Sequence, residues 1–220
     1  MNLRPGLLSW LALACSACVS TPGASILPSV VDAPAAFSIS SSRIDAALAD
    51  SSALIVEPRA YEGVKGAELD AVLPGTPEEV LDALQDFEHM DGRRSIAERF
   101  ELLERDGDRT ISRWHFKRYK IVRPTVSMEH TATRQVAGTG AIEMRYRVVE
   151  PDFGVAALFG SRLLVPITPD ARGGRTFMNW TNHVDTGLPL LSVDADDLAE
   201  AMRTDVEELR VWLLERLTRP

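Results

Sequence analysis

The chain has 220 residues, enough for one hydrophobic core of ordinary size with extensions and too few for two typical domains. Its 24 Lys and Arg residues against 32 Asp and Glu residues give a net charge of −8, which disfavours nucleic acid as a partner. An apolar content of 45% with 25% charged residues is typical of a globular protein, and no stretch approaches the roughly 20 apolar residues that span a bilayer.

The first 18 residues have the features of a secretory leader. Arg4 supplies a short basic region, and residues 7–13 form an apolar run that ends before small residues. The segment 11–15 also resembles a bacterial lipobox, in which the cysteine is diacylated and becomes the new N-terminus. The resemblance implies lipidation at Cys15, with Cys18 as a competing site. An ordinary cleaved signal peptide is one alternative; an uncleaved N-terminal helix, or a cytosolic chain with an unusual N-terminus, is the other.

This leader predicts a location in the cell envelope, on the periplasmic side of a bacterial membrane, with attachment through an N-terminal acyl anchor. A soluble periplasmic or secreted protein is the alternative. Cys15 and Cys18 are the only two cysteines in the sequence. The remainder of the chain therefore has neither a disulfide framework, nor a thiolate metal site, nor a thiol nucleophile.

The segment after the leader, residues 19–58, is rich in Ser, Ala and Pro and contains only a weak helical patch near residues 44–48. Such a segment buries too little apolar area to offset its loss of conformational entropy. We expect a flexible tether over 19–58, followed by a single domain over 59–220.

The domain begins with a strand, predicted from the alternation of apolar residues over 65–73. The next residues, Thr76-Pro77-Glu78-Glu79, combine an N-cap threonine, a proline at the first helical position and a glutamate three residues after the cap. This capping box predicts a helix that starts here. A second short helix is expected over 93–97.

Six further strands follow, separated by turns rich in Gly and Asp. They span residues 100–105, 109–122, 125–134, 141–149, 161–168 and 175–185. Four of the six alternate between an apolar and a polar face, so one face of the sheet should be buried and the other in contact with water.

The last element is a helix over 194–217, acidic at its start and basic at its end, as the helix dipole favours. Its apolar stripe predicts the side that packs on the sheet. The stripe consists of Leu198, Met202, Val206, Leu209, Leu213 and Leu217.

The order of these elements predicts an α+β protein in which a curved, seven-stranded antiparallel sheet wraps on a long C-terminal helix, with two short helices after the first strand. The order, and the segment 67–80 that opens it, resemble the START-like superfamily (SRPBCC, Bet v 1-like), whose fold is called the helix-grip fold. Two later segments share in the resemblance: Tyr119-Lys120-Ile121-Val122-Arg123-Pro124 before a new strand, and Gly174-Arg175-Thr176-Phe177-Met178-Asn179-Trp180 running into Asp185-Thr186-Gly187-Leu188-Pro189.

The resemblance covers about residues 61–218 and implies an internal apolar cavity that holds lipids, sterols, polyketides or other hydrophobic ligands. It carries no universal catalytic residue. Aromatic and thioether side chains on the inward strand faces would give an adaptable lining for such ligands, and His130 would offer a contact for a polar headgroup. The predicted ligand-binding residues are Trp114, Phe116, Met128, His130, Met144, Tyr146, Met178 and Trp180. Ordinary core packing is the alternative interpretation of each.

Residues 109–123 hold six basic residues and no acid, interleaved with aromatic residues. This run predicts either a surface patch for anionic headgroups or cross-strand ion pairs with Glu129 and Glu143.

Together these features favour a non-enzymatic carrier that binds a hydrophobic ligand of lipid, sterol-like or isoprenoid-like character, without a cofactor or a metal. The four histidines are scattered, and no nucleotide, phosphate or hydrolase motif is present. A polyketide cyclase or dehydratase that uses His130 and Tyr146 as acid and base is one alternative. An envelope interaction module, its cavity filled by its own side chains, is the other.

Overall fold

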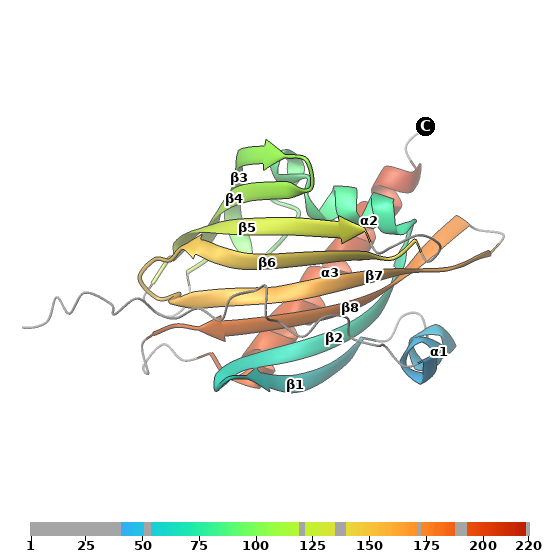
Figure 1. The fold of residues 1–220 in the computed structure, drawn as a ribbon, viewed down its shortest axis with the longest axis horizontal. Helices are drawn as coiled ribbons and strands as arrows, with labels where there is room; N and C mark the ends of the chain where they lie inside the picture. Colours follow the sequence, from blue (N-terminus) through green and yellow to red (C-terminus); the bar gives the residue numbers. More distant parts are fainter. Residues whose placement is uncertain are drawn as a thin grey trace, which may run out of the picture. The chain divides into compact units, whose positions relative to one another are not determined.

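The computed structural model contains one antiparallel sheet of eight strands, with a long helix, α3, lying across one face of the sheet (Figure 1). It describes residues 41–50, 54–118, 122–134, 140–170, 173–187 and 193–218. The predicted leader with Cys15 and the first part of the predicted tether lie outside the described residues. So do residues 119–121 and 188–189 of the segments that carry the family resemblance.

The strands pair in the order β1-β2-β8-β7-β6-β5-β4-β3, and every pair is antiparallel. They are β1 (Ile55–Tyr61), β2 (Val64–Pro74), β3 (Ala97–Asp106), β4 (Arg109–Phe116), β5 (Thr125–Arg134), β6 (Ile142–Glu150), β7 (Ala157–Asp170) and β8 (Gly173–Asp185). The helices are α1 (Ser41–Ala49), α2 (Pro77–Leu84), the 3-10 helix η2 (Phe87–His89) and α3 (Ala195–Thr218). This is the predicted curved antiparallel sheet with a long C-terminal helix.

The predicted capping box at the start of α2 is confirmed. The Thr76 hydroxyl accepts a hydrogen bond from the Glu79 backbone N–H at 3.3 Å, and the Glu79 carboxylate accepts one from the Thr76 N–H at 2.7 Å. Pro77 occupies the first turn, where a missing N–H leaves no helical hydrogen bond unmade. The helix therefore begins where its sequence places it.

The sheet has one strand more than predicted, because β1 pairs with β2. Most of β1 is exposed, and it contains Pro58, so it lacks the alternation that reveals a half-buried strand. Its pairing depends on a tight turn in which Glu62 (φ 49°) and Gly63 (φ 83°) both adopt left-handed backbone conformations. Two such residues are what a two-residue hairpin turn of matching twist requires.

The tether predicted over 19–58 overlaps α1 and the first part of β1. The weak helical patch noted near residues 44–48 is part of α1. Apolar side chains of α1 pack against the outer face of the sheet, opposite to the face that α3 covers. This second, smaller apolar cluster consists of Ile44, Ala47 and Leu48 of α1 with Val72, Val165, Ile167 and Phe177 of the sheet.

An ion-pair network also holds α1 to the outer face. Arg43 donates to the carboxylates of Glu68 and Asp70, each at 2.7 Å, and both carboxylates are almost fully buried. Asn179 donates to the same two groups, and Arg59 donates to Glu68 at 2.8 Å. Buried carboxylates are tolerated because every one is paired and hydrogen-bonded.

The second short helix lies earlier than predicted, at Phe87–His89, and the predicted residues 93–97 are not helical. Gly92 has φ 73°, which breaks the helical path. The next residues bond to α3 rather than to one another: the Ser95 N–H donates to the Glu208 carboxylate at 2.6 Å, and the Arg94 side chain reaches Asp205. Ala97 then begins β3.

The predicted buried faces of the strands and of the last helix are largely confirmed. The α3 residues Leu198, Met202, Val206, Leu209 and Leu213 belong to the main core, and the inward residues of β4, β5, β6 and β8 are buried, except that Phe116 and Val184 are only partly buried against it. Leu217, the last member of the predicted stripe, is 42% exposed because it lies near the end of α3. Among the described residues, no helix combines the length and apolar character that crossing a bilayer requires.

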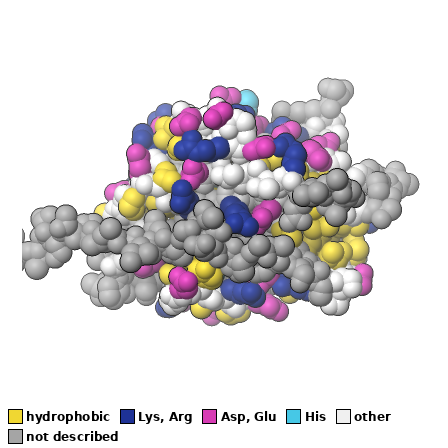
Figure 2. Space-filling model, in the orientation of Figure 1, with side chains coloured by type: hydrophobic (Ala, Val, Ile, Leu, Met, Phe, Trp, Pro, Cys, Tyr) yellow, Lys and Arg dark blue, Asp and Glu magenta, His cyan; other side chains and the backbone are white. Residues whose placement is uncertain are grey.

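The outer face of the sheet carries both signs of charge, interspersed (Figure 2). Glu129 pairs with Arg109 at 2.6 Å and with Arg147 at 2.8 Å, and Arg145 pairs with Glu143 at 3.0 Å. The predicted cross-strand ion pair is therefore confirmed for Arg109, the first residue of the basic run over 109–123. Opposite charges on neighbouring strands favour such a pair.

Candidate ligand-binding site

The predicted ligand-binding residues all face the inside of the sheet. Seven of them are buried, and Phe116, at the end of β4, is partly exposed. Five line a small internal space, namely Trp114, Phe116, Met128, Tyr146 and Trp180. His130, Met144 and Met178 are packed elsewhere in the core and do not line it.

An apolar cleft of about 380 Å³ opens between the first half of α3 and the ends of β4, β7 and β8. Its walls are formed mainly by aliphatic and aromatic side chains, among them Ile96, Phe116, Val155, Leu158, Val184 and Leu198. The exposed Lys117 and Glu200 are also among its lining residues. A concave, mainly apolar space of this size, with a few polar groups, is the usual form of a small-molecule site.

The small internal space has a volume of about 20 Å³. Four residues, Ile96, Phe116, Leu158 and Asn182, line both this space and the cleft, so the two lie next to each other, and we call these four residues the neck. The space is also lined by the aromatic residues named above and by two charged residues, Arg162 and Asp205. Buried charge thus lies on the inner side of the neck.

Arg162, on β7, is the unusual member of this site. Its side chain is 4% exposed, and its guanidinium lies over the rings of Trp180 and Tyr146, at 4.4 and 5.0 Å from the ring centroids. Among the described residues it makes no side-chain hydrogen bond and no ion pair, and burial lowers its pKa. The aromatic rings stabilise the cation but offer it no hydrogen-bond acceptor.

Arg94 and Asp205 form a buried ion pair beside Arg162. Arg94 comes from the segment before β3 and uses two nitrogens to contact both carboxylate oxygens of Asp205, in the middle of α3. This fork-to-fork geometry is the strong form of an arginine–carboxylate pair. Since Asp205 is already engaged in this way, Arg162 is left without a direct counterion.

His130 and Tyr146 occupy opposite positions on β5 and β6, with ring centroids 6.1 Å apart. His130 Nε2 lies 3.0 Å from the Ser112 hydroxyl, which also accepts a hydrogen bond from the Trp114 indole at 2.9 Å. The other ring nitrogen, Nδ1, is buried without a partner. Burial, with smaller contributions from Arg162 and Arg94, lowers the pKa of His130 to about 3, so the ring is neutral near pH 7.

The Tyr146 hydroxyl is fully engaged. It accepts a hydrogen bond from the Trp180 indole at 2.8 Å and shares its own proton between Asn182 Oδ1 at 2.8 Å and the Thr181 carbonyl at 3.0 Å. Burial raises the pKa of Tyr146 to about 12. No hydrogen bond joins Tyr146 to His130; each side chain bonds to other partners.

Sequence reasoning did not find Arg162, Arg94 and Asp205. One signal was available: Asp205 lies three residues after Met202 and thus on the apolar stripe of α3, where an acid needs a buried partner. Arg162 interrupts an apolar run in β7 in the same way. The pairing of Arg94 with Asp205 depends on a contact between distant parts of the chain, which the sequence pattern does not reveal.

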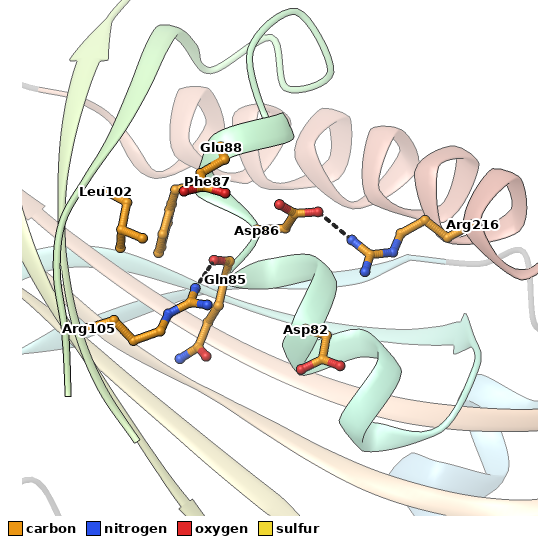
Figure 3. Close-up of a pocket in the computed structure, with 8 residues that line it drawn as sticks. All are labelled: Asp82, Gln85, Asp86, Phe87, Glu88, Leu102, Arg105 and Arg216. Carbon is orange, nitrogen blue, oxygen red and sulfur yellow. Dashed lines mark hydrogen bonds and ion pairs between the residues drawn. The ribbon is translucent and has the colours of Figure 1, made fainter. Parts of the chain in front are cut away.

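A second cleft, of about 280 Å³, lies between the end of α2, η2, β3 and the end of α3 (Figure 3). Its lining is largely polar, and both of its arginines are engaged: Arg216 pairs with Asp86 at 2.6 Å, and Arg105 donates to the Gln85 carbonyl at 2.7 Å. None of the predicted ligand-binding residues lines this cleft. Among the described residues, no group of three His, Cys, Asp or Glu side chains is placed to hold a metal ion.

No protein-family model and no curated protein sequence matches this chain. Solved structures do match. A STAR-related lipid transfer protein from Xanthomonas axonopodis aligns over 73% of this chain and 93% of its own, with 18% identity and a TM-score of 0.61. Human StAR-related lipid transfer protein 5 aligns over 76% of this chain and 84% of its own, with 16% identity and a TM-score of 0.58.

An aromatase/cyclase from a Streptomyces species aligns over 75% of this chain and 96% of its own, with 17% identity and a TM-score of 0.48. The two lipid transfer structures share the sheet and the long C-terminal helix described above. The resemblance drawn from the sequence is confirmed at the level of the fold: the chain has the helix-grip fold of the START-like (SRPBCC) proteins.

Proposed function

We propose that this protein is an exported, lipid-anchored carrier that binds a hydrophobic molecule in the space between α3 and the sheet and presents or moves it within the bacterial envelope. The observation that carries the proposal is the apolar cleft of about 380 Å³, which shares four lining residues with a space that holds buried polar groups. An amphipathic ligand would place its apolar part in the cleft and its polar group at the inner end.

The fold supports this proposal, because two proteins named for lipid transfer have the same arrangement of sheet and helix. The engaged hydroxyl of Tyr146 and the neutral, buried His130 favour binding over proton transfer, so we propose that the protein is not an enzyme.

The sequence supports the proposed export and anchoring. The leader over residues 1–18 and the resemblance of 11–15 to a lipobox would place an acyl chain on Cys15, on the periplasmic side of the membrane. A single acyl chain binds a membrane weakly, whereas two or more give stable attachment, which suits a diacylated cysteine.

Native mass spectrometry with lipid extraction tests the carrier function. The full-length chain with Cys15→Ser and Cys18→Ser, which has no cysteine to acylate, would be purified from its expression host without detergent. We expect a co-purifying apolar molecule that leaves on denaturation. A folded protein that carries no such molecule, and that takes none up from liposomes, would contradict the proposal.

A further inference from the structure

Three buried charges lie at the inner end of the candidate site. Arg94 and Arg162 are cations, Asp205 is an anion, and all three are at most 4% exposed. The two carboxylate oxygens of Asp205 bind Arg94, so the cluster has an excess charge of +1 that resides on Arg162. An unpaired charge inside a protein is costly, and a buried cation is normally retained only where something neutralises it.

The surroundings of Arg162 hold the guanidinium in place without satisfying it. Tyr146 and Trp180 lie against the cation, and these two rings are joined by their own hydrogen bond of 2.8 Å. A guanidinium has five N–H donors in a fixed plane. None of them donates to a described residue, and Arg162 lines the internal space, so the donors are available to a group inside it.

The size of this space limits the group that can fill it. About 20 Å³ is little more than the room that one water molecule needs. A planar carboxylate fits such a space, because its two oxygens match the fork of a guanidinium and carry no further substituent. A phosphodiester or a choline headgroup is too bulky for it.

The rest of such a ligand has a path outward. The neck residues Ile96, Phe116 and Leu158 are apolar, and they line both the internal space and the apolar cleft. An alkyl or ring system attached to the carboxylate would therefore lie against apolar side chains along its whole course.

We propose that the ligand of this cavity is a carboxylic acid amphiphile, such as a long-chain fatty acid, whose carboxylate forms a bidentate ion pair with Arg162. This inference rests on the proposed function and specifies its ligand class. It assigns to Arg162 the role of a specificity residue for the negative headgroup.

The test compares three ligands with the same alkyl chain: dodecanoic acid, dodecan-1-ol and dodecyl phosphate. Each displaces N-phenyl-1-naphthylamine, a neutral apolar fluorophore, from the full-length chain with Cys15→Ser and Cys18→Ser at pH 7.5. We expect dodecanoate to bind at least about tenfold more tightly than dodecanol, as a charge-assisted buried hydrogen bond implies. Dodecyl phosphate should bind more weakly than dodecanoate, because its headgroup is larger.

The variant Arg162→Met should abolish the preference for dodecanoate and leave the affinity for dodecanol within about threefold, because the apolar contacts remain. Arg162→Lys keeps the charge and should retain part of the preference. The exposed Arg134, which pairs with Asp108, provides the matched control Arg134→Met, expected to bind like the unmodified chain.

The outcomes separate this inference from the proposed function. If dodecanol binds the chain with native Arg162 as tightly as dodecanoate does, the carboxylate assignment is wrong while a hydrophobic ligand remains supported; this comparison needs no Arg162 variant to fold. A preference that survives Arg162→Met, or tighter binding of dodecyl phosphate, would also overturn it. If neither the fluorophore nor any of the three ligands binds, the proposed function itself fails.

Discussion

Arg94 and Asp205 are 111 positions apart in the sequence and form an ion pair inside the protein, between the segment before β3 and the middle of α3. The pair joins α3 to the segment that leads into the edge strand β3. It also engages Asp205, the buried acid that lines the internal space together with Arg162. The same contact therefore affects both the stability of the protein and the charge available to a ligand.

Replacing Asp205 with Asn should destabilise the protein by about 3–5 kcal/mol, because it leaves Arg94 and Arg162 without a buried counterion. The double variant Arg94→Met with Asp205→Leu should be less destabilised than Asp205→Asn, since it removes both partners. Urea unfolding followed by circular dichroism measures both. Equal stability of Asp205→Asn and the unmodified chain would show that the pair contributes nothing.

His130 should make stability depend on pH. Its folded pKa of about 3 lies below the ordinary value of 6.5, so the unfolded state binds the proton more readily. The stability that the neutral ring contributes is complete above pH 6.5 and is lost as pH falls toward 3. Between pH 7 and pH 5 we expect a loss of about 2 kcal/mol that is absent from His130→Gln.

Urea unfolding at pH 7, 6 and 5 of the unmodified chain and of His130→Gln provides this measurement. An unchanged slope in His130→Gln would mean that His130 is protonated in the folded protein or is reached by solvent.

Filling the cleft should block binding. Ala201 lies on α3 and lines the cleft, and Val211, on the same helix, is 58% exposed. Ala201→Trp should weaken binding of N-phenyl-1-naphthylamine about tenfold or more, because the indole occupies the space that the probe needs. Val211→Trp adds the same side chain outside the cleft and should bind normally. Equal binding by the two variants would place the site elsewhere.

The contacts of Arg43 predict that α1 is part of the folded domain. Arg43→Met leaves Asp70 with Asn179 alone and should destabilise the protein by about 1–3 kcal/mol. The release of α1 should also speed proteolysis between α1 and β1. Asp45→Asn, an exposed change on the same helix, is the control. Limited proteolysis and urea unfolding should agree, and resistance of the Arg43 variant to both would contradict the role assigned to Arg43.

The proposed anchor gives a prediction for the leader. In a bacterial host, Cys15→Ser should abolish incorporation of labelled fatty acid into the protein and release it from the membrane fraction. Cys18→Ser should leave both unchanged, since Cys15 is the proposed acylation site. Label that depends on Cys18 instead would move the anchor by three residues. An unmodified chain without label would contradict the anchor and leave the alternatives of a cleaved signal peptide or an uncleaved N-terminal segment.

The predictable parts of the fold are those in which the environment of each residue is determined by residues close to it in the sequence. The capping box at Thr76 is a contact within four residues, and the alternation Val126, Met128, His130 on β5 reports burial on one face of a strand. Such local patterns sufficed for all but one strand, for α2 and for the long last helix.

The parts that were not predictable depend on contacts between distant segments. Strand β1 is exposed on an edge, so burial leaves no alternation in its sequence, and only its turn residues mark it. The site was predicted as a lining of aromatic and thioether side chains, and five of those residues do surround the internal space. The charged residues of the site, Arg94, Arg162 and Asp205, were not predicted. They lie on three separate segments of the chain, and only the tertiary structure brings them together.

The position of α1 has a consequence for the direction in which the cleft faces. Helix α1 packs on Val165 of β7, whereas the cleft is lined by Leu158 near the other end of the same strand, roughly 23 Å away at 3.3 Å per residue. The described domain therefore begins, at α1, near one end of β7 and opens its cleft near the other end. A ligand of the cleft would enter and leave without passing α1.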